Sequence, residues 1–145
     1  MNREACMARI KTPEQIAGLR ELGKRHKEVL SAIEARIAPG TALSELEDEA
    51  LRAIAAQGAT PAFKGYMPAG ASRPFPCALC VAPNDTVVHG IPTETAYVLK
   101  EGDIVGIDVG LKKDGLITDA GYTVPVGQVS REANALLATT RAALE

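Results

Sequence analysis

The stretch IVGIDVGLKKDGLITDAGYTVPV, residues 104–126, decides how this chain folds. Apolar and β-branched residues fill both of its ends, which predicts strands from Ile104 to Leu111 and from Leu116 to Val126. Between them lies Lys112-Lys113-Asp114-Gly115, and an Asp-Gly pair flanked by strand residues is a strong signal for a tight turn. The stretch therefore predicts an antiparallel β-hairpin with its turn centred near residue 113 or 114.

Each predicted strand carries one aspartate, Asp108 or Asp119. Side chains alternate between the two faces of a strand, and directly paired residues on neighbouring strands share a face. If the numbers of paired residues add up to an odd number, such as 227 or 229, both carboxylates lie on one face. An even sum or a bulge would separate them. Converging carboxylates repel each other unless a cation lies between them or one is protonated. The favourable register predicts a divalent-cation site; the alternative is a pair of solvated residues near strand ends.

Composition narrows the class of protein. A length of 145 residues with 46% apolar residues suits one globular domain with a packed core. The net charge of −2 gives no field that would attract nucleic acid or an anionic membrane, so we expect neither as a partner. We find no apolar run of membrane-spanning length and no signal-peptide layout, which favours the cytoplasm.

The chain has three cysteines, Cys6, Cys77 and Cys80. An odd count without an export signal fits reduced thiols better than a disulfide framework. Cys77 and Cys80 form a C-x-x-C pair, but the second pair or the histidines that a zinc site needs do not follow. The cysteines therefore predict neither structural zinc nor a redox centre.

Two amphipathic helices are predicted before the hairpin. Thr12-Pro13-Glu14-Gln15 has the pattern of a capping box, and the apolar residues after it predict a helix from about residue 13 to 37. Ser44-Glu45-Leu46-Glu47 begins a second helix, which Gln57-Gly58 ends. His26 lies between Arg25 and Lys27 in the first helix, so we expect it to be an exposed surface residue.

The remaining segments complete a small domain. Proline and glycine between Pro61 and Pro83 favour a loop that lines a pocket. Short strands over residues 79–82 and 86–89 would join the hairpin in an antiparallel sheet with the two helices on one face, an α+β layer. Residues 1–9 are predicted to be a flexible tail, and residues 10–145 to form the domain. A third helix, from Ser130 to Glu145, stops without a cap, which predicts a chain truncated within a helix.

The order of several short motifs resembles that of type I methionine aminopeptidases, members of peptidase family M24. The similarity runs from about Ile10 to Gly127, and the His-Gly-Ile-Pro and Asp-x10-Asp elements are its most specific parts. The matching motifs are Ile10-Lys11-Thr12-Pro13-Glu14-Gln15-Ile16, Gly65-Tyr66, Phe75-Pro76, Cys80, Asn84-Asp85, Val87-Val88-His89-Gly90-Ile91-Pro92, Gly102-Asp103-Ile104-Val105, Ile107-Asp108-Val109, Asp114-Gly115 and Thr118-Asp119-Ala120.

The resemblance implies the amino-terminal half of the pita-bread fold of creatinases and aminopeptidases. It implies a cytoplasmic, ribosome-associated enzyme that removes the initiator methionine from nascent peptides with the help of two divalent ions, whether Co, Mn, Fe or Zn. By position, Asp108 and Asp119 would bind metal and His89 would contact the scissile amide. The corresponding methionine pocket would contain Phe63, Tyr66, Phe75 and Cys80.

Two departures from the family pattern matter. The family uses a further histidine and two glutamates that no residue here matches, so the metal site is incomplete in this chain and the chain alone is expected to be inactive. The segment from Met67 to Arg73 lengthens the stretch between Tyr66 and Phe75, which affects the placement of Phe63 and Tyr66 more than that of Phe75.

Two other interpretations remain open from the sequence. The chain could be a non-catalytic half-domain of the same fold that binds a partner or dimerises to cover a sheet edge. Alternatively, Gly106-Ile107-Asp108-Val109-Gly110 resembles the first phosphate loop of actin-like ATPases and sugar kinases. That loop normally lies near the start of a chain and continues with Thr or Ser, whereas Leu111-Lys112 follows here.

Overall fold

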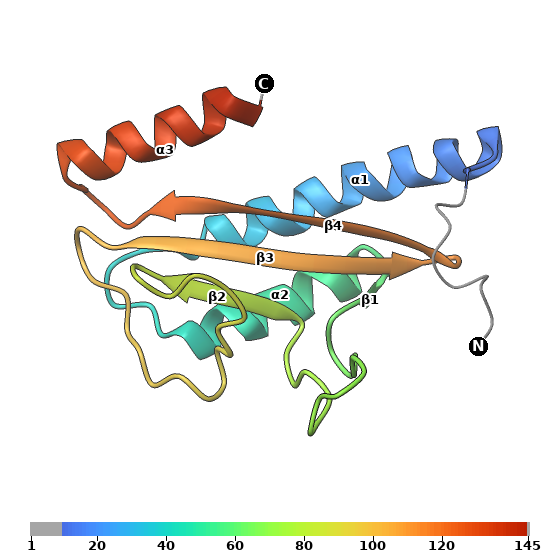
Figure 1. Ribbon diagram of the computed structural model, residues 1–145, viewed down its shortest axis with the longest axis horizontal. Helices are drawn as coiled ribbons and strands as arrows, with labels where there is room; N and C mark the ends of the chain where they lie inside the picture. The colour runs from blue at the N-terminus through green and yellow to red at the C-terminus, as the bar shows by residue number, and fades with distance from the viewer. Residues whose placement is uncertain (1–9, 145) are drawn as a thin grey trace.

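The computed structural model describes residues 10–144, so the predicted tail and Cys6 lie outside the described residues. Three helices and four strands follow one another along this described part of the chain (Figure 1). They are α1 (Pro13–Glu34), α2 (Leu43–Ala56), β1 (Thr60–Pro61), β2 (Leu79–Pro83), β3 (Ile104–Lys113), β4 (Leu116–Pro125) and α3 (Arg131–Leu144). None of the described helices is long and apolar enough to cross a membrane.

Strand β3 is the centre of an antiparallel sheet. Strand β4 pairs with β3 along its whole length, from Ile104↔Pro125 to Lys113↔Leu116. The other edge of β3 is shared by β2, which pairs with residues 105–109, and by the two-residue β1, which pairs with Leu111 and Lys112. The predicted hairpin and the predicted strand over residues 79–82 are confirmed.

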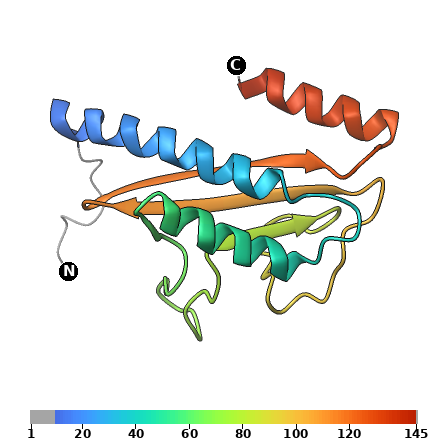
Figure 2. The same ribbon diagram turned by 180° about the vertical axis from the view of Figure 1, so that it is seen from behind.

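Alternation along β3 separates a core face from an open face. Val105, Ile107, Val109 and Leu111 are buried, and they face the helices. Helices α1 and α2 lie side by side on this face, behind the sheet in Figure 1 and in front of it in Figure 2. The intervening residues, Asp108 among them, lie on the opposite face, which none of the described helices covers. The predicted α+β layer is therefore confirmed.

The start of α1 follows the predicted capping box. The Gln15 backbone N–H donates to Thr12 Oγ1 at 3.3 Å, and the Thr12 backbone N–H donates to Gln15 Oε1 at 3.0 Å. The helix ends at Glu34, earlier than predicted. After the Ala35 amide, which still bonds to the Ser31 carbonyl, the amides bond three residues back instead of four: Arg36 to Ile33, and Ile37 to Glu34.

The prediction that His26 is exposed was wrong. His26 is 3% exposed, and its imidazole points from α1 toward β4, where Nδ1 lies 2.9 Å from Thr118 Oγ1. Residue 26 falls on the same helical face as Leu22, Val29, Leu30 and Ile33, all of which are buried. Helical periodicity, rather than the charge of the flanking residues, decides the position of this side chain.

The predicted strand over residues 86–89 is also wrong. These residues form a loop, and Val87 and Val88 are 85% and 63% exposed. The backbone of His89 has a φ of 59°, in the left-handed region, far from the values of a regular strand. One hydrogen bond of 3.1 Å, from the Val81 amide to the Gly90 carbonyl, ties the loop to β2.

A buried carboxylate fixes the start of β2. Glu47, on α2, is 2% exposed. It accepts from the Ala78 amide at 2.9 and 3.1 Å and from the Leu79 amide at 3.0 Å. Both donors are completely buried, so Glu47 satisfies two backbone groups that would otherwise lack partners. This contact ties α2 to the strand that carries Cys80.

The β4 side of the molecule is open. Among the described residues β4 pairs only with β3, so its outer edge carries unpaired backbone groups. Helix α3, predicted from the sequence, lies beyond this edge in both views, and none of its residues is buried (Figures 1 and 2). Ser130 caps it, accepting from the Ala133 amide at 3.1 Å.

Candidate metal centre and its pocket

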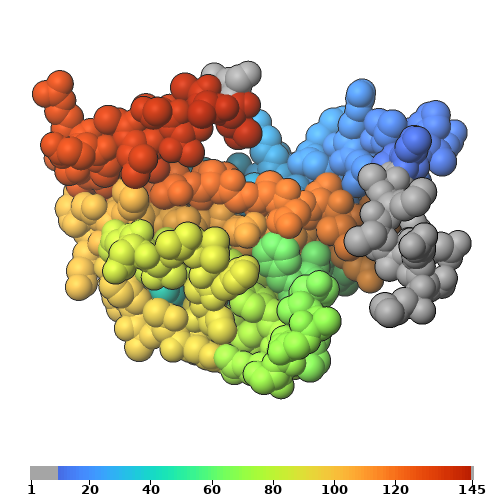
Figure 3. All heavy atoms as spheres, viewed as in Figure 1, coloured from blue at the N-terminus to red at the C-terminus, as the bar shows by residue number. Residues whose placement is uncertain are grey.

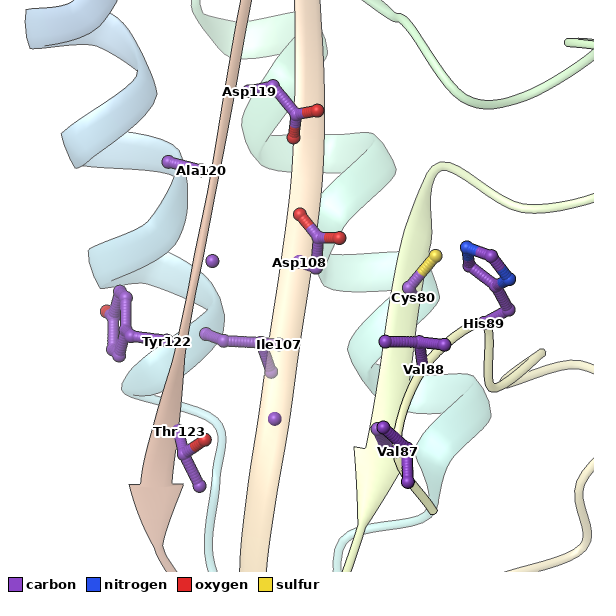
Figure 4. A pocket seen from close by; sticks show the side chains of 13 residues that line it. Cys80, Val87, Val88, His89, Ile107, Asp108, Asp119, Ala120, Tyr122 and Thr123 are labelled. Atoms are coloured by element: carbon purple, nitrogen blue, oxygen red, sulfur yellow. The ribbon is translucent and has the colours of Figure 1, made fainter. Parts of the chain in front are cut away.

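The register of the β3–β4 hairpin brings the two aspartates together. Asp108 pairs with Gly121, and Asp119 pairs with Gly110, so both aspartates lie on the open face as diagonal neighbours. Their carboxylates point toward the same space in Figure 4. The turn has the two consecutive positive φ angles of a tight hairpin, 50° at Asp114 and 76° at Gly115. The favourable register predicted from the sequence is the one observed.

Two glycines make room for this pair. A Cβ on Gly121 would lie 2.6 Å from the Ile107 carbonyl oxygen and 3.0 Å from Asp108 Cβ, so a side chain there would displace Asp108. A Cβ on Gly110 would lie 2.7 Å from the ring of Phe63. The Ala62 amide also donates to the Gly110 carbonyl at 2.8 Å. Phe63 therefore packs over β3 beside the aspartates because residue 110 has no side chain.

The electrostatics of the pair are those of two carboxyl groups in one site. Partial burial and the facing Asp119 carboxylate raise the pKa of Asp108, whereas His89 acts in the opposite direction. The Cys80 thiol, on the residue of β2 that pairs with Asp108, is 7% exposed. Its burial, together with the Asp108 carboxylate, raises its pKa to about 12, so it remains a neutral thiol.

His89 reaches the site from the loop after β2. In Figure 4 its ring lies beyond Cys80, across from the two carboxylates. The adjacent Gly90 presses against β2 so closely that a Cβ there would lie 1.8 Å from the Val81 carbonyl oxygen. A larger residue at position 90 would push the loop away from the sheet and move His89 with it.

Two cavities meet at these residues. One, of about 440 Å³, lies along the open face of the sheet and is lined by Cys80, His89, Asp108 and Asp119 among others. The other, of about 590 Å³, is lined by the same four residues and by apolar side chains. All four residues expected from the resemblance to form a methionine pocket line this second cavity: Phe63, Tyr66, Phe75 and Cys80. We call it the apolar pocket.

The donors present fit part of a metal site. Two carboxylates that face one cavity, one of them with a raised pKa, suit a hard divalent ion. Within residues 10–144 no group of three or more His, Cys, Asp or Glu side chains could hold a metal ion. Cys77 and Cys80 are free, and the Cys77 sulfur lies 3.1 Å from the Thr93 hydroxyl. Asp108 and Asp119 thus supply a partial ligand set.

Sequence reasoning missed what lies behind Asp119. Thr118 points to the opposite face of β4, toward α1, where its hydroxyl meets His26 Nδ1. Nε2 of His26 is buried and has no hydrogen-bond partner within residues 10–144, and burial lowers the pKa of this imidazole. The helical spacing of His26 relative to Leu22 and Val29 was the signal that could have found this contact.

Comparison with known protein families excludes one of the interpretations. The model of metallopeptidase family M24 matches residues 17–145. The chain belongs to metallopeptidase family M24. The phosphate-loop interpretation is therefore wrong, and the structure gives the physical reason: residues 106–110 lie in the middle of strand β3, not in a loop.

Individual M24 relatives are methionine aminopeptidases. That of Helicobacter pylori is 39% identical over 135 residues, which is 93% of this chain and 50% of that protein. The crystal structure of the Thermotoga maritima methionine aminopeptidase superposes with a TM-score of 0.83 at 38% identity, covering 93% of this chain and 51% of that one. The crystal structure of the Rickettsia prowazekii enzyme superposes with a TM-score of 0.85 at 32% identity, covering 94% of this chain and 52% of that one.

The M24 relatives confirm the expected resemblance and fold. The described residues form about half of the pita-bread architecture of these relatives. An Escherichia coli aminopeptidase P also contains this fold, at a TM-score of 0.67 and 23% identity, which concerns the fold alone. The chain spans about half the length of the curated relatives it matches. Membership in this family implies use of a divalent metal.

Proposed function

We propose that this chain contributes to a methionine aminopeptidase that removes the initiator methionine from nascent proteins. The observation that carries the proposal is the meeting of the Asp108–Asp119 pair with the apolar pocket in one cavity system. A metal-ligand pair beside an apolar pocket suits a peptide whose free amino end and first side chain are recognised together. Residues 10–145 would be the amino-terminal portion of such a domain.

The residues of this chain would have distinct tasks. Asp108 and Asp119 would hold two divalent ions, whether Co, Mn, Fe or Zn, which polarise the scissile carbonyl and lower the pKa of water when bound. His89 would donate a hydrogen bond to the scissile amide and stabilise charge that develops there. Phe63, Tyr66, Phe75 and Cys80 would surround the methionine side chain, because aromatic rings and a polarizable thiol suit a thioether.

The partners and location follow from the same proposal. Nascent peptides with an amino-terminal methionine would be the substrates, and the protein would act in the cytoplasm, near the ribosome. Because Asp108 and Asp119 are only part of a ligand set, we expect the 145-residue chain alone to bind metal weakly and to be inactive.

The proposal is tested by release of methionine from a Met-Ala-Ser peptide with Co²⁺ or Mn²⁺ present, before and after chelation. We expect no turnover by the 145-residue chain and chelator-sensitive turnover by a version extended to the length of the relatives. Chelator-sensitive turnover by the chain alone would support the activity but show that the remaining ligands come from elsewhere, such as a second copy. Absence of turnover in both proteins would refute the proposal.

A second candidate is a non-catalytic half-domain that dimerises. The outer edge of β4, unpaired among the described residues, and helix α3, none of whose residues is buried, favour it, because an open strand edge readily pairs with another chain. Sedimentation equilibrium distinguishes the two. A stable dimer without chelator-sensitive turnover would support the half-domain, whereas a monomer would exclude it.

A further inference from the structure

His26 is a buried histidine that the proposed metal site does not use. Its side chain is 3% exposed, and Nδ1 lies 2.9 Å from Thr118 Oγ1. Thr118 directly precedes Asp119 in strand β4. Consecutive residues of a strand point to opposite faces, so Thr118 reaches α1 while Asp119 faces the cavity of about 440 Å³. One short segment of backbone therefore connects the partner of His26 to the carboxylate.

Strand β4 depends on α1 as well as on β3 for its position. Within the described residues its outer edge is unpaired, so backbone hydrogen bonds hold it from one side only. Side-chain hydrogen bonds to α1 lie on either side of Asp119 along the strand. One is the His26–Thr118 contact. The other runs from the Tyr122 hydroxyl to Glu34 Oε2, at 2.6 Å. Figure 4 shows the alternation, with Tyr122 turned toward α1 and Asp119 turned away.

Packing alone does not hold this part of β4 against α1. A cavity of about 510 Å³ is lined by residues of both elements, His26, Thr118 and Asp119 among them. Figure 3 shows the orange atoms of β4 at the surface, beside the blue atoms of α1. Atoms that line a cavity lack part of the van der Waals contacts that fix atoms in a packed core. The direction of the exposed Asp119 side chain therefore depends on the hydrogen bond behind it.

The burial of an imidazole at position 26 carries a cost. Within residues 10–144 its Nε2 is buried without a hydrogen-bond partner, and an apolar side chain would avoid this cost. Thr118 is only half-buried, so water can replace His26 as the partner of its hydroxyl. His26→Leu should therefore preserve the fold and lose only the hydrogen bond.

We infer that His26 is a positioning residue for Asp119: through Thr118 it fixes the rotation of β4 at the point where the strand presents this candidate metal ligand. The inference rests on the metal-ligand role of Asp119 in the proposed function. It gives a task to a side chain on the helix-covered face of the sheet, which touches neither metal nor substrate. Loss of the His26–Thr118 bond should free the Asp119 side chain and weaken divalent-ion binding without unfolding the chain.

The first measurement needs no metal. Three-bond NMR couplings of the β-protons, recorded on the 145-residue chain in EDTA, report the χ1 rotamer of each aspartate. In the wild type Asp119 should occupy one rotamer. In Thr118→Val, which keeps the shape of the side chain but lacks the hydroxyl, Asp119 should average over rotamers, while Asp108 on β3 keeps its wild-type couplings. Thr118→Ser, which keeps the hydroxyl, should restore the single rotamer.

The second measurement is the affinity for Mn²⁺ by calorimetry. Thr118→Val and His26→Leu should each bind Mn²⁺ about three- to ten-fold more weakly than wild type, as expected for one hydrogen bond. This is less than the loss of about ten- to hundred-fold that follows removal of a partner in direct contact with a ligand. The double variant should bind like either single variant, because both remove the same bond. His26→Asn, whose amide takes the place of Nδ1, should retain more affinity than His26→Leu.

Stability to urea separates positioning from a general loosening of the fold. His26→Leu should be at least as stable as wild type at neutral pH, because it removes the unpartnered Nε2. The matched control is Val29→Ala, at a completely buried position three residues along the same face of α1. It should lose stability to urea and bind Mn²⁺ as wild type does. A purely structural role for His26 would instead make stability and affinity fall together.

Three results would overturn the inference: averaged Asp119 couplings in the wild type, wild-type couplings in Thr118→Val, or unchanged affinity in Thr118→Val and His26→Leu when Mn²⁺ binding by the wild type requires Asp119. The failure of the proposed metal site is a different result. If wild type binds Mn²⁺ no more tightly than Asp119→Asn, but the Asp119 rotamer still depends on the Thr118 hydroxyl, the positioning role stands and the metal assignment falls.

Discussion

Replacing Glu47 with alanine should loosen the start of β2 and destabilise the whole domain. The carboxylate is the only partner that the structure gives to the buried amides of Ala78 and Leu79 among the described residues. Truncation leaves both N–H groups buried and unpaired, because their positions are completely inaccessible to water. The loss should propagate to Cys80, which follows on the same strand.

The magnitude follows from those two groups. Each buried donor left without a partner costs about 1–3 kcal/mol, which gives about 2–6 kcal/mol for the pair. Removing the carboxylate also relieves the cost of burying its charge, so we expect a value near about 3 kcal/mol. Glu47→Gln should lose roughly half of this, because one amide oxygen can still accept.

Urea denaturation followed by far-ultraviolet circular dichroism measures the effect. With an m-value of about 1–2 kcal/mol/M, the midpoint should fall by roughly 1.5–3 M. The control is Asp48→Ala, at the exposed neighbouring position on α2, for which a change within about 0.5 kcal/mol is expected. If Glu47→Ala is no less stable than Asp48→Ala, the carboxylate does not fasten β2 and the reasoning is wrong.

Three further predictions concern the site and its support. Gly121→Ala should weaken Mn²⁺ binding at least about ten-fold by calorimetry, because the new Cβ would displace Asp108; unchanged affinity would contradict this. Asp108→Asn and Asp119→Asn should each abolish peptide hydrolysis in an extended protein, and a retained rate in either would disprove its role as a ligand. Burial lowers the pKa of His26 from its usual 6.5, so the unfolded chain binds more protons than the folded one between the two pKa values. The stability that the neutral imidazole contributes is fully present above pH 6.5 and is lost as the pH falls toward the lowered pKa. The loss, at most about 1.4 kcal/mol per pH unit, should disappear from urea titrations of His26→Leu between pH 7.5 and 5.5; an unchanged pH profile would refute it.

Local turn chemistry explains why the sequence predicted the hairpin well. Asp114 and Gly115 both have positive φ, which Asp-Gly accepts readily, and this turn sets the register that pairs Asp108 with Gly121. Once the register is fixed, the period of two along each strand puts both carboxylates on one face. The carboxylate pair was therefore predictable from about twenty consecutive residues.

The errors concern residues whose surroundings come from distant segments. Val87 and Val88 favour a strand by propensity, but they lie in an exposed loop. The path of this loop is fixed by the close approach of Gly90 to Val81. His26 is buried by β4, which lies far along the chain. Glu47 has a charged side chain on a helix, and only tertiary structure shows that it satisfies two strand amides. An ion pair between Arg73 and Glu94 also joins segments that no local pattern relates.

The location of both candidate ligands on one hairpin has a kinetic consequence. Hairpins form in about 1–10 μs, long before contacts between distant segments are complete, so Asp108 and Asp119 should meet early in folding. Their mutual repulsion opposes that meeting, and a divalent ion would relieve it. Because an isolated hairpin is only marginally stable, ion binding at this stage would favour the correct strand register and speed folding. We therefore expect metal availability during synthesis to influence how fast the chain folds.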